Sequence, residues 1–270
     1  MLSTNFKRTV WNFYRSHGRH DLPWRKTHDV YKVLVSEVML QQTQVERVVP
    51  FYKKFIKQFP TAKKLAGAPL SDVLKAWQGL GYNRRAKMLR SAAKQLSEIP
   101  KLSYRTNMVL KLEKLPGVGP YTARAVAAFA LNQDVIVIET NIRTAVIHHF
   151  FPKKKKVSDK EIEKVLVEAL PIGKAREWYS ALMDYGAHLK RSGISHNVKS
   201  KTYAKQSKFA GSLREARGAI LRELARGSAT YARLCNVLGT DRRGQAREAL
   251  RALITEELVT KRGSLAELAA

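Results

Sequence analysis

Cysteine is almost absent from this chain, since Cys235 is the single cysteine among 270 residues. One cysteine excludes a disulfide framework and any metal site built from several thiolates. No apolar run reaches the length of a membrane span, about 18 residues, so we expect no membrane partner. The first eight residues also lack the apolar core of a secretory signal. These absences favour a cytoplasmic protein, associated with the nucleoid.

Acidic residues are also scarce: 22 Asp and Glu stand against 50 Lys and Arg, which gives a formal net charge of +28. The sequence pI is about 10.3. Such an excess of positive charge points to a polyanionic partner, most simply nucleic acid. The length of 270 residues suits one or two domains and allows a sizeable buried core.

Helical spacing of apolar residues dominates residues 1–190, and we see no clear strand before residue 250. We therefore predict an all-α fold. Residues 191–211 follow as a basic linker or arm, in which Lys190 and Arg191 begin a run without acidic residues up to position 208. This run is predicted to lie on DNA phosphates.

Residues 212–270 differ in character from the rest of the chain. Helices are predicted over residues 213–225, 231–238 and 244–257, followed by a small hairpin at 258–264. This pattern resembles a winged helix-turn-helix module. A plain three-helix stability module fits the same pattern.

The sequence LPGVGPYT at residues 115–122 joins an amphipathic run to a helix of small apolar residues. Gly117 and Gly119, on either side of Val118, permit a tight reversal between two helices. The free N–H groups and the dipole at the start of the second helix favour an anion such as a DNA phosphate. An ordinary helix–helix turn would look the same in isolation.

Two carboxylates stand at positions expected to be at least partly buried. Glu37 shares the apolar stripe of a helix predicted over residues 30–43, with Asp29 as its cap. Burial should raise the pKa of Glu37 and suit it to general acid catalysis, although a purely structural Glu is the alternative. Glu139 follows four β-branched residues at 135–138, so it is placed at the edge of the core.

The loop WQGLGYNRR at residues 77–85 combines two glycines, an aromatic ring and two arginines. Such a loop can present Tyr82 to a base stack and Arg84 to a phosphate. A helix end with a core tyrosine is the competing interpretation. Ser71, before this loop, and Ser228, in the C-terminal module, are predicted N-caps of helices.

Across roughly residues 5–190 these motifs resemble the MutY-type adenine DNA glycosylases of the helix-hairpin-helix superfamily. The matching stretches are DLPWR at 21–25, SEVMLQQTQ at 36–44, WQGLGY at 77–82, LPGVGPYTA at 115–123 and Asn141. The resemblance implies a glycosylase domain of two helical lobes over residues 1–190. It also implies a monomeric enzyme of base excision repair. The enzyme would flip adenine out of duplex DNA and cleave its glycosidic bond opposite 8-oxoguanine or guanine.

The resemblance also assigns roles to individual residues. Glu37 corresponds to the general acid, and Glu139 to the carboxylate that stabilises the oxocarbenium-like sugar, by the two-carboxylate logic of glycoside hydrolysis. Tyr121 and Asn141 stand beside them. The remaining assignments are an adenine pocket of Leu22, Trp24, Arg25 and Ser180, and DNA contacts from Gln41, Gln42, Thr43, Tyr82, Arg84, Gly117, Val118, Gly119, Lys190 and Arg191. Relatives of the endonuclease III type carry a Schiff-base Lys where Tyr121 stands, so no lyase activity is expected.

Three departures from the family pattern are visible. The family has Asp where this chain has Glu139, and one extra methylene moves a carboxylate by about 1.3 Å, enough to change the rate. The four-cysteine motif of the iron–sulfur cluster is absent, so no cluster and no other resident metal is expected, apart from a monovalent cation that the resemblance places at the hairpin 115–120. Residues 212–270 are too short for the usual domain that reads 8-oxoguanine, so we expect that domain to be absent. A thymine or uracil glycosylase and a non-catalytic DNA-binding factor therefore remain as alternatives.

Overall fold

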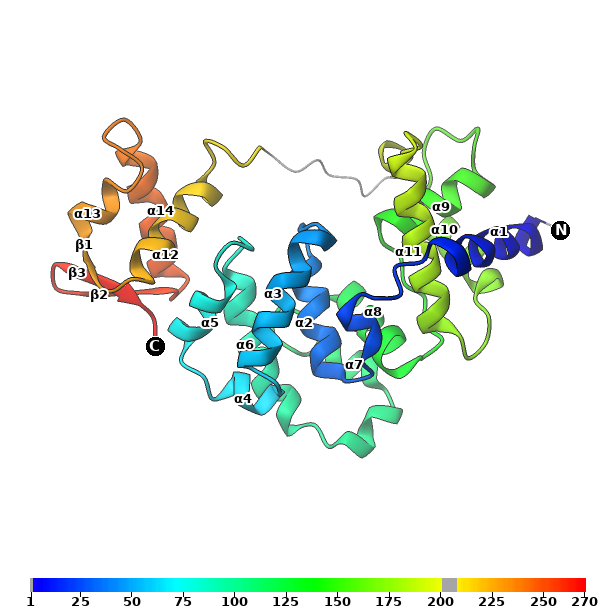
Figure 1. The fold of residues 1–270 in the computed structure, drawn as a ribbon, viewed down its shortest axis with the longest axis horizontal. Coiled ribbons are helices and arrows are strands. Elements are labelled where there is room, and N and C mark those ends of the chain that lie inside the picture. The colour runs from blue at the N-terminus through cyan, green and yellow to red at the C-terminus, as the bar shows by residue number, and fades with distance from the viewer. Residues whose placement is uncertain (1, 201–207) are drawn as a thin grey trace. The chain divides into compact units, whose positions relative to one another are not determined.

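The computed structural model describes residues 2–200 and 208–270 (Figure 1). The described chain divides into two compact units. Unit 1 comprises residues 2–37, 101–114 and 118–200, and unit 2 comprises residues 38–100, 115–117 and 208–270. The division falls inside helix α2 (Val30–Leu40) and again inside the hairpin at 115–120.

Unit 1 is built from helices around one apolar core. The largest of its buried side chains are Trp178, Tyr179 and Phe6. Helix α11 packs against α1, α8 and α9, so this one helix organises the core. The elements are α1 (Leu2–His17), η1 (Pro23–Lys26), the first part of α2, η2 (Lys101–Arg105), α7 (Met108–Glu113), α8 (Pro120–Leu131), α9 (Thr140–Phe150), α10 (Asp159–Ala169), α11 (Ala175–Arg191) and η3 (Asn197–Lys199).

Unit 2 contains a group of helices from the middle of the chain and a small α/β module from its C-terminal part. The first group is α3 (Val45–Gln58), α4 (Ala62–Ala66), α5 (Leu70–Trp77) and α6 (Arg84–Glu98). The module is α12 (Leu213–Leu224), β1 (Ala229–Thr230), α13 (Tyr231–Cys235), α14 (Arg243–Thr255), β2 (Val259–Arg262) and β3 (Leu265–Leu268). Its strands form an antiparallel sheet in the order β1-β3-β2.

The predicted helical fold is confirmed, with one correction in the C-terminal module. The sequence showed no strand before residue 250, but β1 pairs with β3, with Ala229 opposite Ala266. Two residues are too few to show alternation, so only the partner strand reveals this element. The predicted hairpin at 258–264 is present and extends to Leu268.

Several predicted helix ends were wrong, among them the end of α13, which lies at Cys235 rather than at residue 238. Helix α5 begins at Leu70 after Pro69, so Ser71 lies within the helix. Thr230, not Ser228, caps α13, because its side chain accepts the N–H of Arg233. Helix α2 ends at Leu40 rather than at residue 43, because Gln42 takes a left-handed backbone conformation with φ of 55°.

The predicted boundaries at 1–190, 191–211 and 212–270 stay a prediction. The two contact-defined units group the chain differently, since unit 2 includes both residues 38–100 and the C-terminal module. Within the predicted basic arm, positions 201–207 lie outside the described residues. Among the described helices, none is both long and apolar enough to cross a membrane.

Candidate active site

Glu37 lies in the third turn of α2, on the side of the helix that faces the core. It is 6% exposed, and its neighbours Ser36 and Val38 are buried as well. Burial raises the pKa of this carboxyl to about 7, a hydrogen bond from Tyr121 opposes the rise, and the charge of Glu139 adds to it. At neutral pH about half of the Glu37 side chains therefore carry a proton, which is the condition for a general acid.

Tyr121 stands in the first turn of α8 and points its hydroxyl at Glu37. The hydroxyl donates a hydrogen bond to Oε2 of Glu37 at 3.3 Å. Burial raises the pKa of Tyr121 well above 10, and the charges of Glu37 and Glu139 raise it further. Tyr121 therefore stays a neutral donor and fixes one oxygen of the Glu37 carboxyl.

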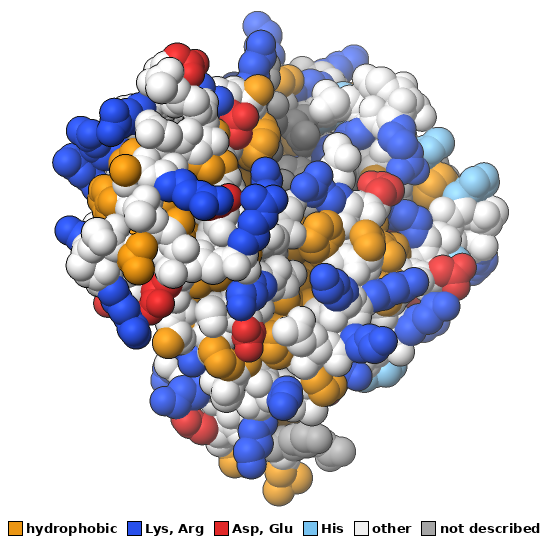
Figure 2. Space-filling model, turned by 60° about the vertical axis from the view of Figure 1, so that its left-hand side comes forward, with side chains coloured by type: hydrophobic (Ala, Val, Ile, Leu, Met, Phe, Trp, Pro, Cys, Tyr) orange, Lys and Arg blue, Asp and Glu red, His pale blue; other side chains and the backbone are white. Residues whose placement is uncertain are grey.

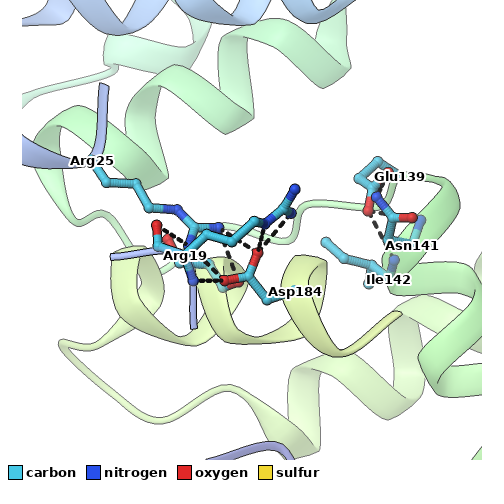
Figure 3. Close-up of polar contacts among 7 residues, drawn as sticks. Arg19, Arg25, Glu139, Asn141, Ile142 and Asp184 are labelled. Atoms are coloured by element: carbon cyan, nitrogen blue, oxygen red, sulfur yellow. Dashed lines mark hydrogen bonds and ion pairs between the residues drawn. The ribbon is translucent and has the colours of Figure 1, made fainter. Parts of the chain in front are cut away.

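Glu139 is the N-cap residue of α9. Its Oε1 accepts the backbone N–H groups of Asn141 at 2.7 Å and Ile142 at 2.9 Å. Its Oε2 accepts the hydroxyl of Thr140 at 3.0 Å and the side-chain amide of Asn141 at 3.3 Å. The close-up shows the contacts of Glu139 with Asn141 and Ile142 at the start of the helix (Figure 3). Four donors and the helix N-terminus together hold one carboxylate in one place.

Lys190, on the last turn of α11, interacts electrostatically with the carboxylate of Glu139. Burial lowers the pKa of Lys190, while the charge of Glu139 counteracts that change. Lys190 therefore lies within electrostatic range of Glu139. Arg191, predicted with it as a phosphate contact, is exposed at the end of the helix.

Asn141 is positioned by a close crossing of α9 and α11. At Gly186 a Cβ atom would lie 2.0 Å from the carbonyl oxygen of Asn141 and 2.9 Å from its Cα. Only a residue without a side chain allows the two helices to approach this closely. Gly186 was not singled out from the sequence, where it is one of 15 glycines.

Replacing Gly186 by Ala should displace Asn141 together with the Glu139 cap. Overpacking costs about 1–3 kcal/mol, and a shift of about 1 Å at a reacting group can cost about 10²-fold in rate. Gly218→Ala on α12 is the control, because a Cβ there meets no atom within 4 Å. The free energy of unfolding, measured with urea, and the single-turnover rate of base release should both fall for Gly186→Ala and stay unchanged for Gly218→Ala. Equal behaviour of the two variants would contradict the role of this crossing.

The predicted base-pocket residues lie on η1, on the residue just before it and on α11. Trp24 and Ser180 are buried and Leu22 is partly buried. Arg25 is engaged by Asp184, with its Nη1 2.7 Å from Oδ2 and its Nη2 3.0 Å from Oδ1. The same guanidinium also donates to the carbonyl of Ser180 at 3.2 Å. Arg25 therefore ties the loop that carries Trp24 to α11.

Asp184 is the partner that the sequence interpretation missed. It is 2% exposed and also binds the backbone N–H of Arg19 at 2.8 Å and its Nε at 2.7 Å (Figure 3). Burial raises the pKa of Asp184, but the hydrogen bonds and charges of Arg25 and Arg19 outweigh it, so the pKa falls below its usual value. A lone acid on the buried face of a helix, with two arginines in one loop, was the available signal.

In unit 2, the predicted DNA-contacting residues Gln42 and Tyr82 share an unusual backbone. Their φ angles are 55° and 47°, a left-handed conformation that is costly for residues other than Gly. Gln42 is exposed, while Tyr82 and the neighbouring Gln41 and Thr43 are partly buried. Strained residues held in place at a surface are typical of functional sites.

Arg85 connects the two strained loops. Its Nη1 donates to the carbonyls of Val38 at 2.6 Å and Gln41 at 2.7 Å, and its Nη2 donates to those of Leu80 and Gly81 at 3.1 Å. The sequence predicted a phosphate contact for Arg84, and the Arg84 side chain is exposed. Arg85 instead donates hydrogen bonds to the last carbonyls of α2 and to the carbonyls of the loop before α6, and so fixes both segments.

The hairpin residues divide by exposure. Gly117 is exposed with φ of +75°, and a Cβ there would meet Met88 at 2.7 Å, so this position requires glycine. Gly119 is exposed with φ of −88°, and a Cβ there would meet nothing within 4 Å. Only the first glycine needs its conformational freedom. The Val118 side chain is buried, so only the backbone of this residue can contact a phosphate.

The residues present do not fit an iron–sulfur cluster. Cys235, the one cysteine in the sequence, is buried on α13, and a cluster of this type requires four thiolates. Within the described residues, no three side chains of His, Cys, Asp or Glu gather to hold a metal ion.

Comparisons with known proteins identify the family of this chain. Residues 35–171 match the family model described as HhH-GPD superfamily base excision DNA repair protein. An adenine DNA glycosylase of Buchnera aphidicola subsp. Baizongia pistaciae is 37% identical over 69% of this chain and 53% of its own length. One from Mycolicibacterium smegmatis is 38% identical over 76% of this chain and 75% of its own.

A solved structure, a thermostable thymine-DNA glycosylase, superposes with a TM-score of 0.60 at 27% identity, covering 69% of this chain and 86% of that one. The chain spans about half the length of the first curated relatives, 53% in the Buchnera protein. The family match covers the acid Glu37, the hairpin and Glu139 alike. The chain therefore belongs to the HhH-GPD superfamily of base excision DNA repair proteins and, within it, to the MutY-type adenine DNA glycosylases.

Proposed function

We propose that this chain is a monofunctional DNA glycosylase that removes adenine mispaired with 8-oxoguanine or guanine in duplex DNA. The observation that carries the proposal is the pairing of a buried carboxyl, Glu37, with a second carboxylate close enough to raise its pKa. This pair lies in a chain 34–38% identical to several adenine DNA glycosylases.

The proposed reaction begins with adenine flipped out of the helix. Glu37, protonated near neutral pH, donates its proton to a ring nitrogen of the base, which neutralises the negative charge that the departing base acquires. Tyr121 holds Oε2 of Glu37, so we assign the proton transfer to Oε1. After the proton is transferred, the ionised Glu37 can take a proton from the attacking water.

Glu139 supplies the second half of the mechanism. As the glycosidic bond breaks, positive charge develops on the sugar, and a fixed carboxylate stabilises it. The four hydrogen bonds to Glu139 mean that the carboxylate needs no reorganisation as this charge appears. Tyr121 offers no amine for a Schiff base, so strand cleavage is not part of the proposed reaction.

The proposed enzyme acts as a monomer on mismatched duplex DNA in the nucleoid. We further propose that it works without an iron–sulfur cluster. The carbonyls of the hairpin 115–120 are its proposed site for a monovalent cation.

A second candidate substrate is thymine or uracil opposite guanine. The fold similarity to a thymine-DNA glycosylase favours it, as does a serine, Ser180, in the proposed base pocket. Single-turnover base release, with alkali to reveal abasic sites, should be measured on duplexes with A opposite 8-oxoguanine, A opposite G, T opposite G and U opposite G. We expect release at adenine only. Release at T or U would replace the substrate, and binding without release would favour a DNA-binding factor.

The same reactions without alkali, with borohydride added, test for a covalent enzyme–DNA adduct. None is expected. A trapped adduct would overturn the monofunctional assignment and would point to an amine such as Lys190, which lies near Glu139.

A further inference from the structure

The C-terminal module has the complete element order of a winged helix-turn-helix. Its helices and strands follow as α12, β1, α13, α14, β2 and β3, and β3 lies between β1 and β2. Helix α14 packs on α12 and α13 through its apolar face, where Ala246, Leu250 and Leu253 are buried. In this arrangement α14 is the second helix of the helix-turn-helix, the one that enters the major groove in DNA-binding members of the fold.

The opposite face of α14 carries a row of arginines. Arg243, Arg247 and Arg251 are all exposed and follow one another at intervals of four residues, so they lie along one side of the helix. Eight residues of helix rise about 12 Å, and phosphates of one DNA strand are spaced about 3.4 Å apart along the duplex axis. The row can therefore follow several successive phosphates.

These three arginines differ from most others in the module. Arg217 pairs with Glu256, Arg242 with Glu215, and Arg233 with Glu223. Among the described residues, none of the three on α14 has a carboxylate within 4.0 Å. A row of exposed guanidiniums without acidic partners is suited to an external anion.

The hairpin of β2 and β3 adds further positive charge. Lys261 and Arg262 are exposed just before the turn at Gly263. Lys261 lies 5.6 Å from the ring centre of Tyr231, whereas Arg262 pairs with Glu267 at 2.8 Å. Residues 208–270 hold twelve basic and seven acidic residues. Lys and Arg side chains are also spread over the molecular face in Figure 2, with few acidic side chains among them.

We propose that α14 and the β2–β3 hairpin form a second duplex-DNA-binding surface, separate from the glycosylase site. Arg243, Arg247 and Arg251 bind phosphates beside the major groove, and Lys261 binds a phosphate next to it. The occupant is duplex DNA because the row is regular, unpaired and carried by the helix that this fold places in the groove. The surface would add binding to DNA of any sequence and leave the chemical step unchanged.

The test uses the full chain and two charge-reversal variants. Arg247→Glu alters the proposed surface, while Arg222→Glu makes the same charge change at an exposed position on α12. The probes are fully paired, fluorescein-labelled DNA duplexes of about one and about three helical turns. A second binding surface needs additional duplex, so the wild type should gain affinity with length. The affinity of Arg247→Glu for the longer duplex should be about tenfold lower than that of the wild type. Arg222→Glu should bind the longer duplex as tightly as the wild type does.

A triple variant, with Ala at positions 243, 247 and 251, extends the test. The slope of log affinity against log salt should fall by about 0.9 for each phosphate that the variant no longer neutralises. Single-turnover base release on a short duplex that carries adenine opposite 8-oxoguanine should stay at the wild-type rate, which separates this surface from the active site. Equal binding of the longer duplex by Arg247→Glu and Arg222→Glu would overturn the proposal. A reduction in affinity seen only on an RNA duplex of the same sequence would overturn it too.

Discussion

Glu37→Gln is expected to abolish base release while leaving binding to mismatched duplex nearly intact. Gln keeps the shape of the side chain and an oxygen that can accept the Tyr121 hydroxyl, but it has no proton to give to the leaving base. General acid catalysis is worth about 10²–10⁴-fold, so the single-turnover rate should fall by at least that factor. A variant that releases adenine at the wild-type rate would remove Glu37 from the mechanism.

The pH dependence of the wild type follows from the same carboxyl. Since the pKa of Glu37 is about 7, the acid form is present below that pH and lost above it. Base release should therefore be steady below pH 7 and fall about tenfold per pH unit above it. Any residual base release by Glu37→Gln should show no such step, because this variant has no proton to lose at position 37.

Stability should fall with rising pH, as activity does, but over a lower pH range. The pKa of Glu37 is about 7 in the folded chain against an ordinary 4.5, so the folded state holds a proton that the unfolded state releases between these values. The contribution of Glu37 to the free energy of unfolding is therefore largest below pH 4.5. It decreases as the pH rises from 4.5 to 7 and stays low above pH 7. Glu37→Gln removes this loss of stability, so it should raise the free energy of unfolding by up to about 3 kcal/mol at pH 8 and by less at pH 5. Urea unfolding at the two pH values measures this difference.

The sequence predicted the Glu37 environment well because a single helix determines it. The apolar stripe of α2 is complete within eleven residues, and the carboxylate falls on it. Asp29 was predicted as the cap of the same helix, and its Oδ1 accepts the N–H of Lys32 at 2.9 Å. Local periodicity and capping are short-range properties, so a single sequence reveals them.

The contacts that fix the site were not visible because they join distant segments. Asp184 and Arg25 are 159 positions apart, and Gly186 matters only because α9 crosses there. Arg85 donates hydrogen bonds to carbonyls more than 40 positions earlier in the chain, and only the fold brings it to the end of α2. The strand β1 was missed for the same reason, since its partner is at the far end of the module.

Glu139 supports the second large prediction, because its carboxylate combines a structural role with a catalytic one. Asp, the residue at this position in the family pattern, is also a good N-cap and can reach the same backbone N–H groups. Glu139→Asp should therefore keep α9 capped and the chain folded. Its carboxylate, however, is drawn back toward the helix by about 1.3 Å, a displacement that costs about 10²-fold in rate. The site in this chain is arranged around the longer side chain.

Glu139→Gln separates charge from position. The amide keeps an oxygen for the N–H groups of Asn141 and Ile142 but carries no negative charge for the developing cation on the sugar. Its single-turnover rate should be at or below that of Glu139→Asp. Glu161→Asp is the matched control, because Glu161 also accepts a backbone N–H at a helix start, that of Ser158 at 3.0 Å, on α10. That change should leave the rate unaltered. A Glu139→Asp variant as fast as the wild type, or faster, would mean that the Glu139 carboxylate does not act from the position it holds here, because its displacement would then cost nothing.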